Sequence, residues 1–423
     1  MREPSAKYLT RPGYKQTEVG VIPEDWEVKP VSAMGDVRAG KALAARGMGQ
    51  QRPYLRTKNV FDGRIDLNDV LRMPMTDNEF LRYRLRYGDV LLNEGQSLEL
   101  VGRCAMYKDE YPEPCAIQNQ LIRFRARDGV SASFATQLFR HCQKSGVFTN
   151  IALQTTSVAH LGVSRLHSLQ LAWPPEAAEQ EVIAEALSNA DALIESLEKL
   201  IAKKCHLKQG AMQELLTGKK RLSGFSEEWE VKRLSDLADI RSGGTPSTTQ
   251  PHLWDGDVFW CTPTDITALN GHKYLSKTSR TITQQGLKCS SAEMIPANSI
   301  VMTSRATIGE CAINSVAVST NQGFKNFIPF EIVDVEFLYY LLLTQKQEFI
   351  NLCGGSTFLE IGKAQLVVFE VRLPVTKAEQ TAIATILSDM DVEITALETK
   401  LTKARQLKQG MMQELLTGKI RLV

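Results

Sequence analysis

The residues best suited to chemistry in this chain lie in turn-rich loops and carry hydrogen-bonding groups. Stretches such as GKALAARG (Gly40–Gly47), NEGQSLELVGR (Asn93–Arg103) and TSRATIG (Thr303–Gly309) combine arginine, amide and hydroxyl side chains with glycines. These side-chain types pair with the base edges and phosphates of nucleic acid. For any single residue, an ordinary surface loop is the competing interpretation. The candidate nucleic-acid contacts are Lys41, Arg46, Lys58, Asn59, Gln96, Ser97, Arg103 and Asn119 in the first half of the chain, and Thr245, Thr262, Asp265, Ser304, Arg305, Thr307, Asn321 and Gln322 in the second.

No motif predicts covalent chemistry. The chain has no G-x-x-x-x-G-K-[ST] phosphate loop, G-x-S-x-G elbow, H-E-x-x-H pair or glycine-rich methyl-donor loop. Among its six histidines, only His160 and His167 are close neighbours, and they lack a paired nucleophile. The eight cysteines include no C-x-x-C pair, so we expect free, mostly buried thiols and no metal site. The sequence therefore predicts a protein that is not an enzyme.

An internal repeat must position these loops. LKQGAMQELLTGKKRL (Leu207–Leu222) and LKQGMMQELLTGKIRL (Leu407–Leu422) are identical at fourteen of sixteen positions. The chain is thus two similar units, each a variable globular segment followed by a closely repeated one. What the halves share is common machinery, and what differs has separate tasks. Shorter matches extend the repeat: AEQ begins at Ala178 and Ala378, and WEVK begins at Trp26 and Trp229.

The closely repeated segments are predicted to be long helices. Their apolar residues alternate at spacings of four and three, which is a heptad seam. Pro174 and Pro374 precede the helices, and Gly218 and Gly418 stand where they would stop. Because the apolar stripe is narrow, we expect the helices to pair with each other rather than only with their own globular segments. The predicted seam comprises Ile183, Leu187, Ile194, Leu197 and Ile201 in the first helix, and Ile383, Leu387, Ile394, Leu397 and Leu401 in the second.

The globular segments alternate short apolar strands with turns. Runs such as GDVLL, LIRFRAR and NSIVMTS predict strands, while Ser133–Gln143 and Glu336–Ile350 each predict a single helix. This indicates an α+β fold: two similar globular domains separated by two long helices that form an antiparallel coiled coil, with a pseudo-twofold internal repeat. The expected boundaries are an N-terminal segment 1–25, a first domain 26–173, a central helix 174–222, a second domain 223–373 and a C-terminal helix 374–423.

Composition leaves most function classes open. The 423 residues are 43% hydrophobic and 23% charged, with a net charge of +2. We expect no membrane segment and a cytoplasmic location, because no run approaches about 18 apolar residues and the N-terminus does not resemble a signal peptide. The basic stretch Lys203–Arg221 is either a solvated helix face or a footprint for phosphate or an acidic partner.

Nearly the whole chain resembles the specificity (S) subunits of type I restriction–modification systems. The similar phrases are YKQTEVGVIPEDWEV (Tyr14–Val28), YGDVLLNEG with LVGR, SGGTPS, WCTPTDI and the doubled LKQGxMQELLTGKxRL. The resemblance implies two target-recognition domains that each read one half of a bipartite, asymmetric double-stranded DNA site. It implies that the paired helices set the half-site spacing and bind two methyltransferase (M) subunits, with restriction (R) subunits as possible further partners. S-adenosylmethionine, ATP and Mg would then belong to those partners, and this chain would hold no cofactor.

The sequence departs from the family pattern in two ways, and two other classes of protein are alternatives to a specificity subunit. The first domain has RAGKALAARG where the second has SGGTPS, so its base contacts are assigned less firmly, and the two half-sites should differ. A nuclease or methylase with its own specificity domain would show a catalytic motif. A coiled-coil adaptor or scaffold without a DNA-reading role would lack salt-dependent DNA binding in the assembled complex.

Overall fold

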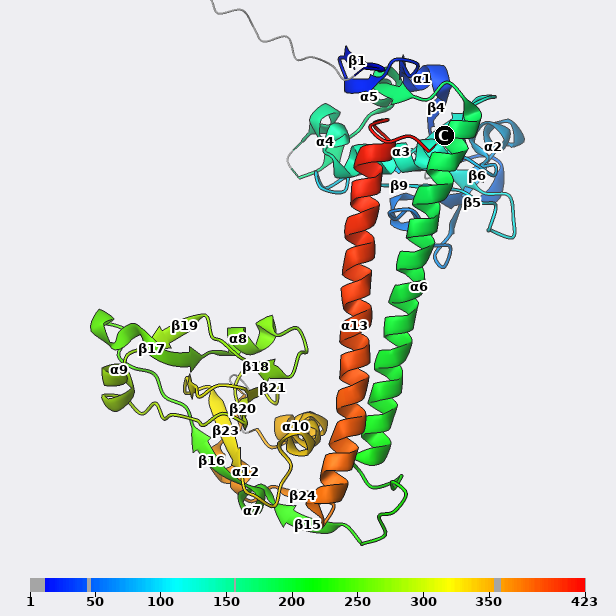
Figure 1. The fold of residues 1–423 in the computed structure, drawn as a ribbon. Helices are drawn as coiled ribbons and strands as arrows, with labels where there is room; N and C mark the ends of the chain where they lie inside the picture. Colours follow the sequence, from blue (N-terminus) through cyan, green and yellow to red (C-terminus); the bar gives the residue numbers. More distant parts are fainter. Residues whose placement is uncertain (1–11, 44–46, 156, 354–358, 423) are drawn as a thin grey trace, which may run out of the picture. The chain divides into compact units, whose positions relative to one another are not determined.

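The computed structural model describes residues 12–43, 47–155, 157–353 and 359–422. The chain forms two compact units: unit 1 comprises Met1–Glu198 with Lys400–Val423, and unit 2 comprises Lys199–Thr399. Each unit contains a globular domain and a part of both long helices, α6 (Ala177–Leu215) and α13 (Lys377–Leu415). Figure 1 shows α6 in green and α13 in orange to red. Among the described residues, no helix combines the length and apolarity needed to cross a membrane.

Unit 1 is built on one four-stranded antiparallel sheet and smaller sheets beside it. The main sheet has the order β4 (Gly35–Ala39), β11 (Leu121–Ala126), β7 (Val90–Asn93) and β9 (Cys104–Met106). The smaller sheets are β10 (Ala116–Ile117), β5 (Gln50–Leu55) and β6 (Leu71–Met75); β12 (Leu153–Gln154), β13 (Ala159–His160) and β8 (Gly95–Gln96); β14 (Gln170–Trp173) with β3 (Glu27–Pro30); and β1 (Tyr14–Thr17) with β2 (Gly20–Pro23). The short helices are α1 (Val31–Met34), η1 (Thr57–Asn59), α2 (Asp77–Tyr83), α3 (Ala132–Lys144), α4 (Val147–Ile151) and α5 (Val163–Ser168).

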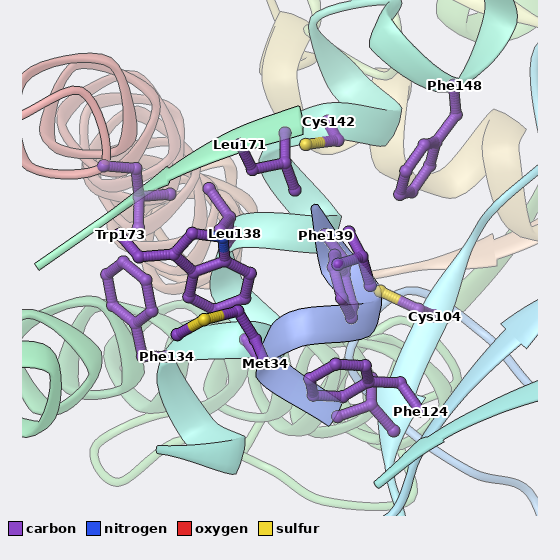
Figure 2. Packing of buried hydrophobic residues seen from close by; sticks show 14 of the residues in the cluster. Met34, Cys104, Phe124, Phe134, Leu138, Phe139, Cys142, Phe148, Leu171 and Trp173 are labelled. Carbon is purple, nitrogen blue, oxygen red and sulfur yellow. The ribbon is translucent and has the colours of Figure 1, made fainter. Parts of the chain in front are cut away.

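The core of unit 1 gathers around α3. Phe134, Phe139 and Trp173 are almost fully buried and pack with residues of the main sheet (Figure 2). The rings of Phe124 and Phe139 meet edge to face, with centroids 5.0 Å apart. Burying side chains of this size supplies much of the apolar driving force for a domain. Burial also raises the pKa of the Cys142 thiol to about 12, so this cysteine stays protonated and behaves as a small apolar residue.

Unit 2 repeats this plan with a wider main sheet. Its order is β16 (Ala238–Ser242), β23 (Phe324–Pro329), β20 (Ser299–Thr303), β21 (Cys311–Asn314) and β18 (Tyr274–Leu275). The smaller sheets are β19 (Arg280–Ile282), β17 (Trp254–Cys261) and β22 (Ser319–Thr320), and β15 (Glu230–Arg233) with β24 (Glu370–Leu373). The short helices are α7 (Leu234–Leu237), η2 (Pro251–Leu253), α8 (Pro263–Ala268), α9 (Gln284–Lys288), α10 (Val335–Thr344), α11 (Lys346–Asn351) and α12 (Lys363–Val367).

One predicted element is corrected. The single helix expected over Glu336–Ile350 is broken into α10 and α11 at Gln345, whose backbone N–H bonds the carbonyl of Leu342 instead of continuing the α-helical pattern. The apolar periodicity runs through the break because both pieces bury residues in the same core, including Tyr340 and Phe349. A periodic pattern therefore did not distinguish one helix from two short ones.

In each unit, the ends of the two long helices are joined by the repeated residues. In unit 1, Arg421 binds both carboxylate oxygens of Glu179 at 2.7 Å, and Lys408 Nζ lies 2.5 Å from Asp191 Oδ1. In unit 2, the equivalent pairs are Arg221 with Glu379, and Lys208 with Asp391. Because residue numbers rise along one helix as they fall along the other, the helices are antiparallel within each unit. The predicted α+β class with an internal repeat and paired antiparallel helices is confirmed.

The predicted seam residues fall into two groups by burial. Ile183 and Leu187 belong to the core of unit 1 together with Met412, Leu415 and Leu416 of α13 and its end, so they pack on the globular domain as well as on the partner helix. Ile383 and Leu387 do the same in unit 2. Leu397 and Leu401 are 9% exposed. The remaining seam residues, Ile194, Leu197, Ile201 and Ile394, are half-buried.

Candidate nucleic-acid interface

In unit 2, loops from distant parts of the chain meet where several strands end. The backbone N–H of Ser304 donates to the carbonyl of Gly323 at 2.7 Å, and that of Asn321 donates to the carbonyl of Cys261 at 3.1 Å. The N–H of Gly244 donates to the carbonyl of Thr320 at 2.9 Å. We call residues 243–247, 261–265, 303–309 and 320–323 the second loop cluster. It brings together all eight candidate residues that the sequence predicts in this half of the chain.

The glycines of SGGTPS are required by close backbone approach. A Cβ at Gly243 would lie 1.9 Å from the carbonyl oxygen of Asn321. Two indole N–H groups also bind the backbone of this loop. Trp260 Nε1 donates to the carbonyl of Gly244, and Trp254 Nε1 donates to the carbonyl of Ser247, both at 3.0 Å. The loop is therefore fixed by the fold rather than left free.

Several candidate residues of the second loop cluster are engaged within it. Thr262 caps α8, and its N–H and hydroxyl both donate to Asp265 Oδ2 at 2.8 Å. Burial would raise the pKa of Asp265, but hydrogen bonds from Ser279 and Thr262 outweigh burial and lower it. Thr245 bonds Gln322, which is exposed.

Two other candidates of this cluster, Ser304 and Arg305, lie near a buried lysine that sequence reasoning missed. The Nζ of Lys325, which is 5% exposed, lies 3.4 Å from Ser304 Oγ and 3.7 Å from a carboxylate oxygen of Glu360. Burial lowers the pKa of Lys325. Arg305 Nε binds Glu360 at 2.8 Å while the arginine stays half-exposed. Thr307 is exposed, and Asn321 accepts the N–H of Gly323 at 2.9 Å.

Unit 1 has a matching set of loops at the corresponding strand ends. The N–H of Asn119 donates to the carbonyl of Lys41, and that of Glu94 to the carbonyl of Gln120, both at 2.9 Å. The Thr57 hydroxyl lies 3.5 Å from Gln120 Oε1. We call residues 40–41, 56–59, 93–97 and 118–120 the first loop cluster. Beside it, His160 Nδ1 lies 3.0 Å from Glu94, at the place where unit 2 pairs Glu360 with Arg305.

The candidate residues of unit 1 differ in their availability. Lys58 is exposed and binds Asp69 at 2.7 Å, whereas Lys41 is largely covered and pairs with Glu79. Gln96 is half-buried in β8, and Ser97 and Asn119 are exposed. Arg46 lies outside the described residues.

Asn59 and Arg103 are held by their own surroundings. The Asn59 amide donates to the carbonyls of Asp66 and Asp69 and accepts the N–H of Arg56, so its hydrogen bonds are used inside the loop. The Arg103 guanidinium lies over the ring of Phe61, 4.8 Å from its centroid, and burial lowers the pKa of Arg103. The assignment of these and the other candidate residues to DNA contacts stays a prediction.

Unit 1 also contains a polar cavity of about 840 Å³ between α3 and the two long helices. Arg140, which is 7% exposed, binds Asp62 at 2.6 Å and Asp191 at 2.5 Å, and Lys408 approaches Asp191 from α13. Burial would raise the pKa of Asp191, but the hydrogen bonds and charges of Arg140 and Lys408 outweigh burial and lower it. Within the residues that the structure describes, no cluster of three or more His, Cys, Asp or Glu side chains could hold a metal ion.

The corresponding junction in unit 2 uses different side chains. Tyr340 of α10 donates to Asp391 Oδ2 at 2.5 Å. Lys273, beside β18, reaches Glu336 at 2.8 Å and Ser388 of α13 at 2.6 Å. Burial would raise the pKa of Glu336, but bonds from Lys273, Ser388 and Tyr274 outweigh burial and lower it.

Two similar domains, each with a loop cluster at matching strand ends and each joined to parts of both long helices, define an internally duplicated protein. Residues 23–203 and 226–407 each match the model of the family described as "Type I restriction modification DNA specificity domain". Together these matches cover most of the chain. The chain belongs to this family.

Individual relatives agree in length and fold. The chain is 26% identical to the putative type I restriction enzyme MjaX specificity subunit of Methanocaldococcus jannaschii over 98% of each protein. It is 40% identical to the MjaIX specificity subunit of the same organism over 39% of this chain and 38% of that protein. Its fold is similar to that of a type I restriction–modification S subunit from M. genitalium, with a TM-score of 0.55 and 15% identity over 92% of this chain and 96% of that one. A chain from a structure of type I R-M complex assembly gives a TM-score of 0.60 at 16% identity, over 94% of this chain and 99% of that one.

Proposed function

We propose that this chain is the specificity subunit of a type I restriction–modification complex, in which each unit reads one half of a bipartite, asymmetric DNA site. The observation that carries the proposal is the pair of loop clusters at matching strand ends. The loops occupy the same places in the two domains, but their side chains differ. Equivalent positions with different hydrogen-bonding groups are what two different half-sites require.

The repeated residues of the long helices are the common machinery in this proposal. Two M subunits bind at the paired helices, and R subunits join the complex. This chain itself carries no catalytic group and no cofactor, while S-adenosylmethionine, ATP and Mg serve the partners. The relatives are specificity subunits of type I restriction enzymes, which supports this class of complex. The two near-equivalent helix junctions support two similar binding places for M subunits.

The experiment is methylome mapping in a host that expresses the full chain with its M partner. Lys58→Ala changes an exposed residue of the first loop cluster, and Gln322→Ala changes an exposed residue of the second. Each variant is expected to relax base preference in one half-site only, with the other unchanged. Arg233→Ala, on the exposed side of β15, is the control and should leave both half-sites intact.

Other outcomes would contradict the proposal. A loss spread evenly over both half-sites would indicate phosphate contacts or misfolding. Methylation by the purified chain without an M partner would show that it is an enzyme. Binding of the assembled complex to DNA that is insensitive to salt and sequence would favour a scaffold without a reading role.

A further inference from the structure

Arg280, at the start of β19, lies over the rings of two tryptophans. Its guanidinium carbon lies 3.9 Å from the ring centroid of Trp254 and 5.3 Å from that of Trp260. The two indole rings meet edge to face with centroids 4.9 Å apart. Arginine favours aromatic faces because its cation is planar and weakly hydrated, and stacking leaves its N–H groups directed outward in the plane. Arg280 itself is exposed.

The aromatic platform is rigid. Trp254 is 8% and Trp260 is 4% exposed, and both belong to a small apolar core with Val258 and Ile282. Their indole N–H groups are fixed on the backbone of the SGGTPS loop, as described above. The platform therefore holds the Arg280 guanidinium close to that loop.

Arg280 also borders the rest of the second loop cluster. The N–H of the preceding residue, Ser279, donates to Asp265 Oδ1 at 2.7 Å, and the N–H of Trp260 donates to the hydroxyl of Thr278 at 3.2 Å. The segment that carries Arg280 is thus tied to the N-terminal cap of α8 and to the end of β17.

Across the described part of the chain, no hydrogen bond or ion pair holds the Arg280 guanidinium, whereas Arg305 binds Glu360 and Arg241 binds Asp239. Five N–H donors in a fixed plane, exposed beside a recognition loop, are suited to a planar acceptor pair. Such pre-organisation reduces the entropy lost when a partner binds.

Unit 1 has no arginine at this position. In the sheet of unit 2, Trp260 is paired with Arg280 on the antiparallel neighbour strand and with Ser319 on the parallel one. In unit 1, Tyr54 is paired in the same way with Leu71 on the antiparallel neighbour and with Ala116 on the parallel one. Leu71 therefore stands where Arg280 stands. A contact to the DNA backbone, which both half-sites share, would be expected in both units. An arginine present in one unit only is instead suited to a sequence-specific contact.

We propose that Arg280 reads a guanine in the half-site of unit 2 by donating two hydrogen bonds to its O6 and N7 atoms. This inference deepens the proposed function and rests on it. Bidentate pairing of arginine with guanine is the commonest specific contact in the major groove. Trp254 and Trp260 act as positioning residues that keep the guanidinium plane in place.

The test uses the full chain assembled with its M partner and a library of duplexes in which each base of the mapped target is varied in turn. Arg280→Ala should lower discrimination at one guanine of the unit 2 half-site by roughly 10- to 100-fold. Discrimination at the other positions should be unchanged. Arg280→Lys should keep much of the affinity but lose most of that discrimination, because a lysine is a point charge without the fork. Arg233→Ala is the matched control, and thermal melting should show all three variants folded.

The outcomes separate this inference from the function on which it rests. A uniform loss of affinity with a weaker salt dependence would show a phosphate contact and overturn the inference. Unchanged discrimination in Arg280→Ala would also overturn it. If the wild-type complex reads no bipartite site, the proposed function itself fails.

Discussion

The two units attach their domains to the same helical pair by different chemistry. In unit 1, Arg140 of α3 binds Asp191 of α6 beside a polar cavity, and β9 lies at the edge of the main sheet. In unit 2, Tyr340 of α10 binds Asp391 of α13, and β18 extends the sheet toward Lys273 and its contacts.

The comparison shows that the helix residues at these junctions are the same in both units, whereas the domain residues that contact them differ. The helix residues occur twice with the same partners, as in Lys408 with Asp191 and Lys208 with Asp391. The domain residues that meet them have diverged in charge and size. A repeated carboxylate can accept an arginine or a tyrosine, so the domains could change while the helical frame stayed the same.

The largest expected effect comes from removing unit 2's domain entirely. Consider a half-chain that ends at Leu222. In a dimer of this half-chain, residues 200–222 of the second copy can occupy the place that residues 400–422 have in unit 1. The two segments are interchangeable because Lys208, Gly218 and Arg221 repeat Lys408, Gly418 and Arg421. We expect a dimer that, with M subunits, directs methylation to a palindrome of the first half-site. Light scattering and methylome mapping would measure this.

Two results would contradict the half-chain prediction. One is a soluble monomer, and the other is a dimer that keeps the asymmetric target. The exchange is not perfect, because Ala211 replaces Met411, which packs on the core of unit 1. An Ala211→Met half-chain should therefore form a more stable dimer than the unmodified one.

The arginine junction should be the more fragile of the two. Arg140→Leu removes the buried cation that Asp62 and Asp191 share, leaving Lys144 for Asp62 and Lys408 for Asp191. It should destabilise unit 1 by about 3 kcal/mol, the lower end of the range for breaking a buried ion pair. Tyr340→Phe removes one hydrogen bond to Asp391, which keeps Lys208, and should destabilise unit 2 by about 1.5–3 kcal/mol. Native-state hydrogen exchange, compared segment by segment, separates the units. Equal effects in both units would mean that the junctions are equivalent despite their chemistry.

The helix ends offer a matched pair of glycines. Gly218 and Gly418 have φ values of +71° and +70°, so an alanine at either position costs about 1–2 kcal/mol. A Cβ at Gly418 would also lie 2.5 Å from the ring of Pro23, whereas the nearest atom at Gly218 is 3.2 Å away in Trp229. We expect Gly418→Ala to be more destabilising than Gly218→Ala by about 1–3 kcal/mol. Denaturant unfolding of the two variants would measure the difference, and the reverse order would refute the argument.

The smallest expected effect is the loss of the stability contributed by Asp191 at acidic pH. Because the pKa of Asp191 is lowered in the folded protein by Arg140 and Lys408 despite burial, its ionised form contributes stability above the unfolded pKa of about 3.9. That contribution is lost as pH falls through the folded pKa. The stability difference between wild type and Asp191→Asn should therefore shrink below about pH 4, by at most about 1.4 kcal/mol per pH unit. Urea titrations from pH 7 to pH 3 would measure it, with exposed Asp128→Asn as the control. A constant difference would show that Asp191 does not titrate in this range.

Features set by local sequence were predictable. The heptad spacing and the glycine stops located α6 and α13, because helix period and termination depend on neighbouring residues. The ion pairs that join the ends of these helices were not predictable. Glu179 and Arg421 are 242 positions apart, and nothing in the triplet AEQ indicates that its glutamate binds the end of the other helix.

The candidate site was predictable as a set of loops but not residue by residue. Asn59 has the composition of a base contact, yet its hydrogen bonds are used by carbonyls that the fold brings to it. Arg280 was missed because its neighbours in the sequence are unremarkable. The signal that could have found it is the pair Trp254 and Trp260 in β17, whose rings meet although the strand shifts register between Trp254 and Val258.

The composition of unit 1 from residues 1–198 and 400–423 has a consequence for protein synthesis. The ribosome releases all of residues 199–399 before the segment that supplies Lys408 and Arg421, so unit 2 can complete its core first although it is encoded second. At about 5–20 residues per second, synthesis of the segment from residue 400 onward, which completes unit 1, takes a further one to five seconds or so. A premature stop codon near position 400 would therefore spare the unit encoded in the middle of the gene and disable the one encoded at its start.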